Sequence, residues 1–437
     1  MSARRGFPRG WWLLAIAFPF VALLLAIGGV LIAGQGGFAA LYVPAGESAP
    51  VSSDAATLRR GEYLARLGNC TTCHSVRGGA PLAGGRPFVT PWGTLYSSNL
   101  TPDPDTGIGD WSLAEFRHAM KHGVSRRGAL YPAFPFQNFQ HLETGDVDAI
   151  FAWLRSQPAV AAPVPANRLE GIAGWRAAMI GWRMVFHRPH PLAEVPARDA
   201  DWQRGRYLVE GLGHCAMCHG QRGAWGSMVP MLRHAGGDIP GQGWHAPALD
   251  RDALARWRVP DLAEYLRSGV APQASAYGPM AEVIQSSLQY LSADDARAIA
   301  TYLLELPPAP KIARRPVYPV ERARNLVGIT SATLYNTHCG DCHGADGRGR
   351  ERVYPPLAGN PQVLASDPVN LIRVTLFGAA APTTAGNPAP HSMPPFTGRL
   401  TDADLIAILN HIRGSWGNDA TAIGATQLQA VRALPLE

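Results

Sequence analysis

The longest uninterrupted apolar run of the chain lies near its N-terminus. From Trp11 to Ala33 there are 23 residues without a charge, and a helix of this length, at ~1.5 Å per residue, crosses a ~30 Å hydrocarbon layer. Three arginines precede the run, and the next charged residue is Glu47. The pattern predicts that residues 1–45 form a single transmembrane anchor in the inner membrane, with the rest of the chain on the periplasmic side. A cleaved signal peptide is the alternative.

Beyond residue 54 the pattern changes to short amphipathic helices between Gly- and Pro-rich loops. Similar sequences, Arg60-Gly61-Glu62-Tyr63-Leu64 and Arg204-Gly205-Arg206-Tyr207-Leu208, are expected to form helices that open two similar units. Each unit is expected to end in an amphipathic helix with a Ser or Thr as N-cap. These helices and their N-caps are 146–154 with Thr144, 293–304 with Ser292, and 402–413 with Thr401. The pattern predicts a mainly α fold.

All six cysteines of the chain belong to three copies of Cys-x-x-Cys-His. The copies are Cys70, Cys73 and His74; Cys215, Cys218 and His219; and Cys339, Cys342 and His343. Two thiols at this spacing suit the two vinyl groups of one porphyrin, and the following His can bind its iron from the same short helix. Redox-active thiol pairs and zinc sites also use Cys-x-x-Cys, but neither requires the His in every copy. The sequence therefore predicts three covalently bound haems c and no disulfide.

The motifs and the Pro-rich connectors together predict three consecutive cytochrome c domains after the N-terminal helix. The domains are expected at 54–158, 200–307 and 318–418, with a linker at 159–199 and a C-terminal tail at 419–437. Within the linker, residues 171–188 interleave Trp, Met and Phe with Arg. This amphipathic segment suits a membrane surface, a partner subunit, or packing against its own protein.

Charge excludes one class of partner. The chain has 39 Lys and Arg against 33 Asp and Glu, a net charge of +6, and three of the arginines lie before the N-terminal apolar run. A balance of +3 on the remainder is too small to indicate nucleic-acid binding.

Methionine is the usual second axial ligand of haem in such domains, and two of the nine methionines hold matching positions. Met280 stands 61 residues after His219, and Met393 stands 50 residues after His343. Each is flanked by Pro in a loop just before the last helix of its unit. Although a lone Met is more often a core residue, the repeated position favours ligation of iron.

The first unit departs from this pattern. Phe134, 60 residues after His74, takes the place of the expected ligand, and a phenyl ring cannot bind iron. Met120 is the only Met of this unit, but aligning Gly123 with Gly269 places it opposite Leu266, a core-like position. Nitrogen ligands are the other candidates, namely His118, His122 and His141. The sixth ligand of the first haem is thus Met120, one of these histidines, or none.

With these features the chain resembles the three-haem cytochrome c subunits of bacterial membrane-bound dehydrogenases. These serve quinoprotein alcohol dehydrogenases, flavin-dependent gluconate, sorbitol or fructose dehydrogenases, and molybdenum-dependent aldehyde dehydrogenases. The stretches that carry the resemblance are 61–66, 94–103, 106–109, 211–215 and 393–396, which read GEYLAR, TLYSSNLTPD, TGIG, GLGHC and MPPF.

The resemblance covers most of residues 58–418. It implies that the chain accepts electrons from a catalytic dehydrogenase subunit and delivers them to ubiquinone, with Met280 and Met393 as axial ligands. Phe134 departs from the family pattern, which has a ligating Met in this Tyr-Pro-Ala-x-Pro stretch.

Two classes of function compete for this sequence. One is a non-catalytic electron-transfer subunit of a dehydrogenase complex, which we favour because the chain contains no Ser/His/Asp array, dinucleotide fingerprint or molybdenum-binding pattern. The other is a self-sufficient haem enzyme, such as a peroxidase-like protein with an open first iron. A free-standing membrane cytochrome that donates electrons to an oxidase is a third alternative.

Overall fold

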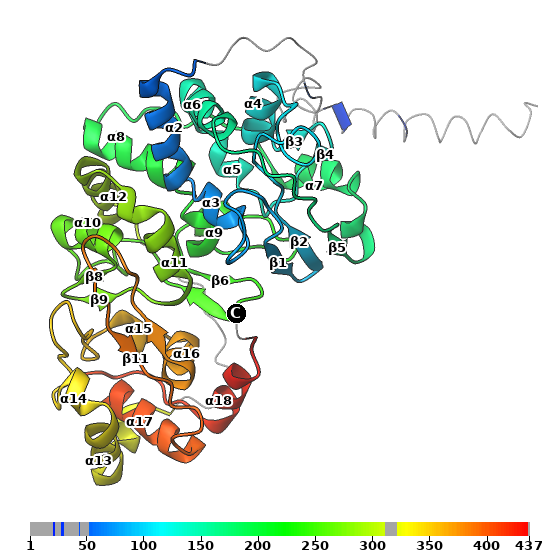
Figure 1. Cartoon of the computed structure of the whole chain (residues 1–437). Coiled ribbons are helices and arrows are strands. Elements are labelled where there is room, and N and C mark those ends of the chain that lie inside the picture. Colours follow the sequence, from blue (N-terminus) through cyan, green and yellow to red (C-terminus); the bar gives the residue numbers. More distant parts are fainter. Residues whose placement is uncertain (1–20, 22–27, 30–42, 44–51, 311–320, 436–437) are drawn as a thin grey trace, which may run out of the picture.

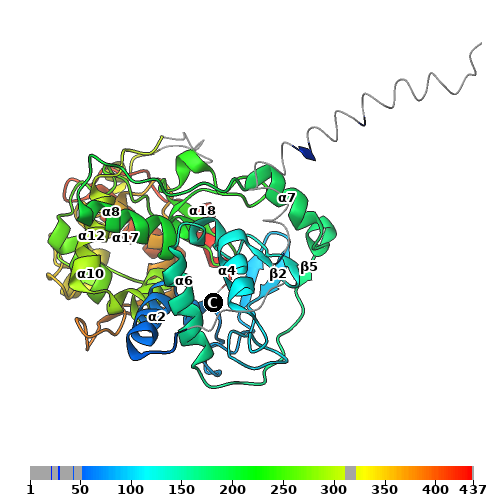
Figure 2. The same cartoon turned by 90° about the horizontal axis from the view of Figure 1, so that it is seen from above.

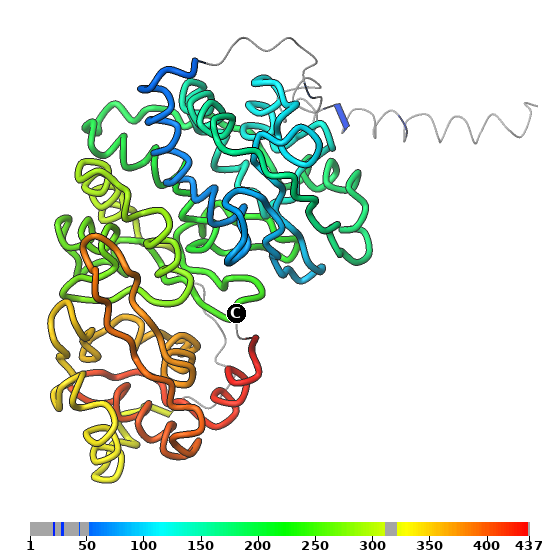
Figure 3. The backbone as a smooth tube through the Cα atoms, in the orientation of Figure 1, coloured from blue at the N-terminus to red at the C-terminus, as the bar shows by residue number. Residues whose placement is uncertain are grey.

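The computed structural model of the protein describes residues 21, 28–29, 43, 52–310 and 321–435. We call the segments 54–158, 200–307 and 318–418 the first, second and third unit; these boundaries remain predictions. Figures 1 and 3 show the second unit between the other two, with the third at the opposite end of the molecule from the first.

Short helices dominate each unit. The first contains α2 (Ala55–Leu67), α3 (Cys70–Cys73), β1 (Pro87–Thr90), β2 (Gly93–Tyr96), α4 (Leu113–His122), β3 (Val124–Ser125), β4 (Gly128–Ala129), α5 (Phe136–Phe139) and α6 (Thr144–Arg155). The linker adds β5 (Arg168–Leu169), η2 (Gly171–Gly174) and α7 (Ala178–Phe186). Strand β5 extends the antiparallel β1–β2 hairpin, which fastens the linker to the first unit.

The second unit follows a similar order. It contains α8 (Ala200–Tyr207), η3 (Leu208–Leu212), α9 (Ala216–His219), η4 (Pro230–Leu232), β6 (Gly237–Ile239), β7 (Trp244–Ala246), α10 (Val259–Ser268), β8 (Val270–Ala271), β9 (Ala274–Ser275), α11 (Gly278–Ser286), η5 (Leu288–Tyr290) and α12 (Ala293–Leu304). The third contains η6 (Ala323–Leu326), α13 (Ile329–His338), α14 (Gly340–His343), α15 (Pro361–Leu364), α16 (Val369–Phe377), β10 (Ala379–Ala380), β11 (Ser392–Met393) and α17 (Asp402–Gly414), and the C-terminal tail adds α18 (Ala425–Arg432). Apart from the β1–β2–β5 sheet, the described strands pair as two-stranded antiparallel hairpins.

The last helix of each unit is present, and two of the three predicted N-caps are correct. The Ser292 hydroxyl accepts from Asp295 N at 3.0 Å, and the Thr401 hydroxyl accepts from Asp404 N at 3.2 Å. The prediction for Thr144 is wrong by one position, because Thr144 is the first residue of α6 and Glu143 is its N-cap. Glu143 makes no side-chain capping bond.

Helices α2 and α6 of the first unit cross at a glycine, and α8 and α12 of the second cross in the same way. A Cβ atom added to Gly61 would lie 2.0 Å from the carbonyl oxygen of Ala149, and one added to Gly205 would lie 2.0 Å from that of Ala298. Only glycine permits so close an approach of two helix backbones. The similar sequences around the two glycines therefore reflect the same helix crossing.

The first and second units share one hydrophobic core. Its buried residues include Leu64 and Leu154 of the first unit and Leu208 and Leu303 of the second. The third unit has two clusters of its own, one around Leu405 and Leu409 and the other around Tyr335 and Ile412. The sequence did not predict this shared core, in which each of the first two units buries apolar surface against the other.

Two tyrosines cross between the first and second units. Tyr63 Oη donates to Asp295 Oδ2 at 2.6 Å, and Tyr207 Oη donates to Asp146 Oδ2 at 2.7 Å. Each aspartate also binds the arginine that stands three residues before the tyrosine of its own unit. The tyrosine of each unit thus donates to the aspartate of the other unit, and the two contacts are reciprocal, as in a two-fold symmetric dimer.

The second unit has one more residue than the first between the crossing glycine and the first cysteine of its motif. Nine positions separate Gly61 from Cys70, whereas ten separate Gly205 from Cys215. The extra residue lies in η3, a π-helical turn closed by the bond from Gly213 N to Leu208 O at 2.7 Å. A π-turn absorbs a single inserted residue without altering the helix before it.

The predicted transmembrane anchor is not supported. In the part of the chain that the structure describes, no helix has the length and apolar character needed to cross a membrane. Except for Val21, Gly28 and Gly29, the run from Trp11 to Ala33 lies outside the described residues. The inner-membrane location inferred from a single N-terminal anchor is therefore corrected as well.

The amphipathic segment of the linker packs one of its faces on its own protein. On α7, Met179 and Arg183 are buried, and the Arg183 guanidinium lies 5.5 Å from the centre of the Phe136 ring. Ile180 and Val185 on the same helix are exposed. Figure 2 shows α7 at the rim of the first unit, away from α10 and α12.

Candidate haem sites

Each Cys-x-x-Cys-His motif lies on a short helix that follows the first helix of its unit. Helices α3, α9 and α14 carry the motifs. In the first two units the residue before the motif has a left-handed backbone, with φ of 56° at Asn69 and 39° at His214. This local reversal ends the preceding helix and starts the short one in a new direction. All six cysteines are free thiols, as covalent attachment of haem requires.

The histidine of each motif is oriented by a backbone carbonyl from a later loop. The Nδ1 atoms of His74, His219 and His343 lie 2.7, 2.7 and 3.0 Å from the carbonyl oxygens of Ser98, Pro247 and Pro355, respectively. A carbonyl oxygen only accepts, so Nδ1 carries the proton and Nε2 carries the lone pair that can bind iron. Sequence reasoning missed these carbonyls, two of which belong to prolines, Pro247 and Pro355.

Burial sets the protonation states of the motif residues. It lowers the pKa of all three motif histidines, that of His219 to about 4, so the imidazoles are neutral near pH 7. Burial also raises the pKa of Cys70 and Cys215 to about 12. Reactive redox cysteines have lowered pKa values instead, so these thiols do not suit a thiol–disulfide enzyme.

The two candidate methionine ligands lie on elements just before the last helix of their units. Met280 is in the first turn of α11 and packs against the core shared by the first and second units. Met393 is on β11, opposite Ala379 of β10, and packs against the third unit's own core. Both are partly buried.

In the first unit, an aromatic cluster occupies the segment that corresponds to Met280. The Phe134 ring makes an edge-on contact with Phe139 at 5.4 Å between centroids, and Phe139 makes another with His214 at 5.7 Å. Met120 is 5% exposed and belongs to the shared core, as Leu266 does in the second unit. Gly123 and Gly269, the C-caps that align them, both have left-handed backbones. This is the packing role that the alignment predicts for Met120.

The candidate histidines of the first unit lie away from Met120. His118 and His122 are four residues apart on α4 and their rings lie 4.7 Å from each other, on a face roughly opposite that of Phe116 and Met120. Burial lowers the pKa of His122 to about 4, and the charge of Arg183 on α7 contributes to this shift.

His141 packs at the boundary with the second unit. Its ring lies 5.1 Å from that of His190, and its Cβ atom lies beside Gly211 of η3. Met120 and Phe134 both contribute to the core shared by the first and second units.

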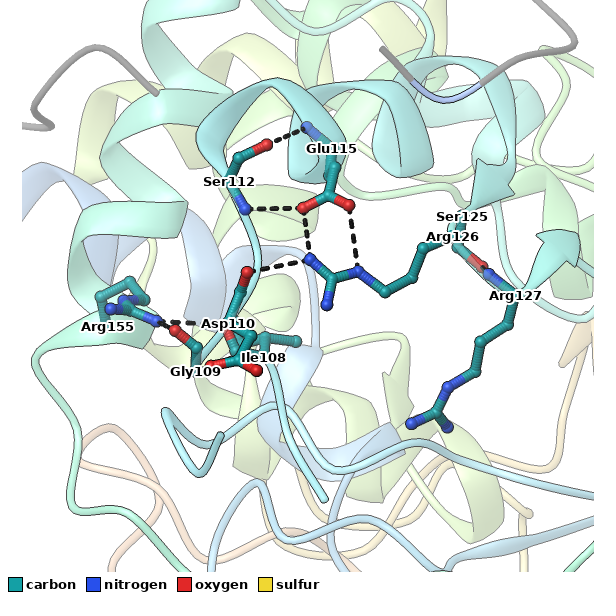
Figure 4. Close-up of polar contacts among 9 residues, drawn as sticks. All are labelled: Ile108, Gly109, Asp110, Ser112, Glu115, Ser125, Arg126, Arg127 and Arg155. Atoms are coloured by element: carbon teal, nitrogen blue, oxygen red, sulfur yellow. Dashed lines mark hydrogen bonds and ion pairs between the residues drawn. The ribbon is translucent and has the colours of Figure 1, made fainter. Parts of the chain in front are cut away.

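The start of helix α4 is fixed by a network of polar contacts (Figure 4). Ser112 and Glu115 form a capping box, with Ser112 N donating to Glu115 at 2.8 Å and Glu115 N donating to Ser112 at 3.1 Å. Arg126, from the turn between β3 and β4, binds the Glu115 carboxylate and the carbonyl oxygen of Asp110. The carbonyl oxygens of the two residues before Asp110 accept from Arg155 of α6. This network opposes any turning of α4 that would bring Met120 out of the core.

A buried carboxylate lies beside the second motif. Glu210, in η3, accepts from His234 Nε2 at 2.7 Å and from Tyr302 Oη at 2.8 Å, and it pairs with Arg233 at 2.8 Å. Burial alone would raise the pKa of Glu210, but the bond from His234 and the charge of Arg233 outweigh it and lower the pKa to about 2. Sequence reasoning did not identify this group.

The described residues fit haem c at all three motifs. Each motif offers a pair of free thiols and a neutral histidine whose Nδ1 is bound to a carbonyl. Among the residues of 52–310 and 321–435, no group of three or more His, Cys, Asp and Glu side chains is arranged to hold a metal ion.

Comparison with known proteins places the chain in a class and then in a family. Residues 330–416 match the family model of cytochrome c, and cytochromes of this class bind haem c covalently. The match covers one segment of the third unit, so the expectation of three consecutive cytochrome c domains is not supported.

Three relatives define the family more narrowly. The cytochrome c subunit of gluconate 2-dehydrogenase from Pantoea cypripedii is 40% identical over 84% of this chain and 87% of its own length. The cytochrome c subunit of the quinone alcohol dehydrogenase from Gluconobacter oxydans is 36% identical over 87% and 83%. The cytochrome subunit of fructose dehydrogenase from Gluconobacter japonicus is 33% identical over 89% and 85%. The chain belongs to this family of dehydrogenase cytochrome c subunits, and it is an electron-transfer protein.

Proposed function

We propose that the chain carries three covalent haems c and transfers electrons from a catalytic dehydrogenase subunit to ubiquinone. The observation that carries this proposal is the threefold occurrence of one arrangement, a free thiol pair followed by a histidine whose Nδ1 is bound to a backbone carbonyl. Haem c, when bound, supplies an iron that takes up and releases one electron at a time. The relatives are subunits of dehydrogenases for gluconate, alcohol and fructose, which supports a quinoprotein, flavoprotein or molybdenum enzyme as the partner.

The residues of this chain have distinct roles in the proposal. Cys70 and Cys73, Cys215 and Cys218, and Cys339 and Cys342 attach the three haems, and His74, His219 and His343 bind their irons. Met280 and Met393 are the sixth ligands of the second and third haems. The sixth ligand of the first haem is Met120, His118, His122, His141 or none, because Phe134, at the place that matches Met280, cannot bind iron.

Mass spectrometry of the purified holoprotein tests the haem count. Three haem additions to the polypeptide mass are expected, and replacing both cysteines of one motif by alanine should remove one addition. A count of one, at the third motif alone, would contradict the proposal and agree with the single segment that matches the cytochrome c family.

Reconstitution tests the electron route. The purified chain, mixed with the catalytic subunit of a gluconate, alcohol or fructose dehydrogenase and a soluble ubiquinone analogue, should support quinone reduction that depends on the dehydrogenase substrate. Reduction of the haems without reduction of the quinone would rule out ubiquinone as the acceptor and leave the dehydrogenase as the electron donor.

A further inference from the structure

Helix α11, which carries Met280, lies where all three units meet. On its inner side Ile284 is completely buried. Toward the first unit, the hydroxyl of Ser287, just after the helix, donates to the carbonyl oxygen of Leu67 at 3.2 Å. Toward the third unit, the side-chain oxygen of Gln285 accepts from Thr383 N at 3.2 Å. The neighbouring units therefore hold the element that presents the second unit's candidate ligand.

The most direct of these links is an ion pair between the first unit and α11. Arg86 donates from Nη1 to Glu282 Oε1 at 2.7 Å and from Nη2 to Oε2 at 3.0 Å. The same Nη1 donates to the carbonyl oxygen of Thr72 at 2.9 Å, inside the first Cys-x-x-Cys motif. One guanidinium therefore joins α3, the attachment helix that carries the first motif, to α11. On α11, Met280 lies two residues before Glu282.

The backbone of Arg86 is itself held in place. Arg86 N donates to Ser97 Oγ at 3.0 Å, and Ser97 N donates back to the carbonyl oxygen of Arg86 at 3.0 Å. The Arg86 side chain is 27% exposed and that of Glu282 is 44% exposed. A simple ion pair at this exposure contributes little, but a bidentate pair with a further charge-assisted bond fixes geometry as well as energy.

We propose that Arg86 and Glu282 are positioning residues for the sixth ligand of the second haem. By tying α11 to the first attachment helix, they hold Met280 over its haem, so that ligation in the second unit depends on the intact first unit. This inference rests on the proposed role of Met280 as a ligand. Neither residue touches the iron; each acts through the position of α11.

Imidazole binding to the oxidised full-length holoprotein tests the proposal, because imidazole occupies an iron only when the sixth position is open. Met280→Ala should open the second haem and bind imidazole without delay. Arg86→Gln and Glu282→Gln should each speed imidazole binding at one haem by about fivefold, as the loss of one charge-assisted link allows. The matched control is Arg77→Gln, an exposed arginine of the first unit for which the described residues show no ion pair; its rate should equal that of the wild type.

The double variant Arg86→Gln with Met280→Ala identifies the haem that responds. It should bind imidazole no faster than Met280→Ala alone, because both changes act on the same bond. If Met280→Ala opens the second haem while Arg86→Gln and Glu282→Gln leave imidazole binding unchanged, the positioning role is wrong and the ligand assignment stands. A lower melting temperature without a faster rate would likewise overturn the positioning role, because the pair would then only stabilise the fold. If Met280→Ala itself binds no imidazole, Met280 is not the ligand and the proposed function fails at this site.

Discussion

The first and second units share the same helix crossing and the same bonds between units, but they differ in the segment just before the last helix, which we call the distal segment. Gly61 and Gly205 make the same helix crossing, and Tyr63 and Tyr207 make the same bond to an aspartate of the opposite unit. At the segment before the last helix, the first unit has Phe134 in an aromatic cluster, whereas the second has Met280 on α11.

The residues that hold the helices together are the same in both units, whereas the residue at the position of Phe134 and Met280 differs. The scaffold residues are constrained by backbone contact and by buried hydrogen bonds, so they match in both units. The distal residue only has to fill space beside the shared core, and a phenylalanine does this as well as a methionine does. Under the proposed function, the sixth ligand of the haem in one unit can therefore change without a change of fold.

The largest expected effect tests the matching scaffold. Gly61→Ala and Gly205→Ala would each place a Cβ atom 2.0 Å from a helix carbonyl oxygen, and each should lower the free energy of unfolding by about 3 kcal/mol or more. The control is Gly145→Ala in α6, where nothing lies within 4 Å of the added atom and a gain of up to ~1 kcal/mol is expected. Urea denaturation measures all three, and markedly unequal costs for Gly61 and Gly205 would refute the equivalence of the crossings.

The next largest effect is the pH dependence of stability that comes from Glu210 of the second unit. Its pKa of about 2 in the folded protein lies below its ordinary value of 4.5. Its ionised form therefore stabilises the fold at pH values above 4.5, and this contribution, up to ~3 kcal/mol, is lost as the pH falls from 4.5 toward 2.

Denaturation at pH 6 and at pH 3 compares the wild type with Glu210→Gln. The variant should be less stable at pH 6, and the gap should narrow at pH 3. A gap that stays constant between the two pH values would show that the Glu210 charge does not contribute.

Exchanging the distal residues should exchange the redox properties of the two units. Thioether ligation favours the reduced iron, so Met280→Phe should lower the potential of one haem, and Phe134→Met should raise another. A shift on the order of 100 mV, which is ~2.3 kcal/mol for one electron, is expected for each. Redox titration followed by absorbance measures both, and an unchanged titration in Met280→Phe would assign Met280 to packing.

The smallest expected effect concerns the crossed tyrosines. Tyr63→Phe and Tyr207→Phe each remove one bond to an aspartate that keeps its arginine partner, so each should cost about 1–2 kcal/mol. The two costs should be similar and, because both bonds stabilise the same interface, each variant should destabilise both units together. Hydrogen exchange can measure the stability of each unit, and a loss of stability in one unit alone would contradict the shared core.

Local sequence patterns predicted the short-range features of the fold well. The motif spacing located the short helices of the three candidate sites, and the alignment of Gly123 with Gly269 located Met120 in the core. Both depend on neighbouring residues, whose geometry the backbone fixes directly.

Long-range features could not be predicted in this way. The carbonyls that orient the motif histidines come from residues 12 to 28 positions later, and the Arg86–Glu282 pair spans 196 positions. Fusion of the first two units was missed because amphipathic helices show that a face is buried, but not what buries it. The N-terminal apolar run predicted a membrane anchor from its length and flanking arginines, but no helix of the described residues could cross a membrane, and the run lies almost wholly outside them.

The π-turn η3 allows the second unit to have one more residue than the first between the crossing glycine and the motif. A residue inserted into an ordinary α-helix would rotate everything after it by about 100°, which would turn the second motif relative to the helix crossing at Gly205. The wide turn confines the insertion to Leu208–Leu212, and within it the carbonyl oxygen of Glu210 accepts from Asn138 Nδ2 of the first unit at 2.7 Å. The inserted residue thus acts as a spacer that keeps the motif in phase with the helix crossing, and the turn that contains it adds an anchor point for the neighbouring unit.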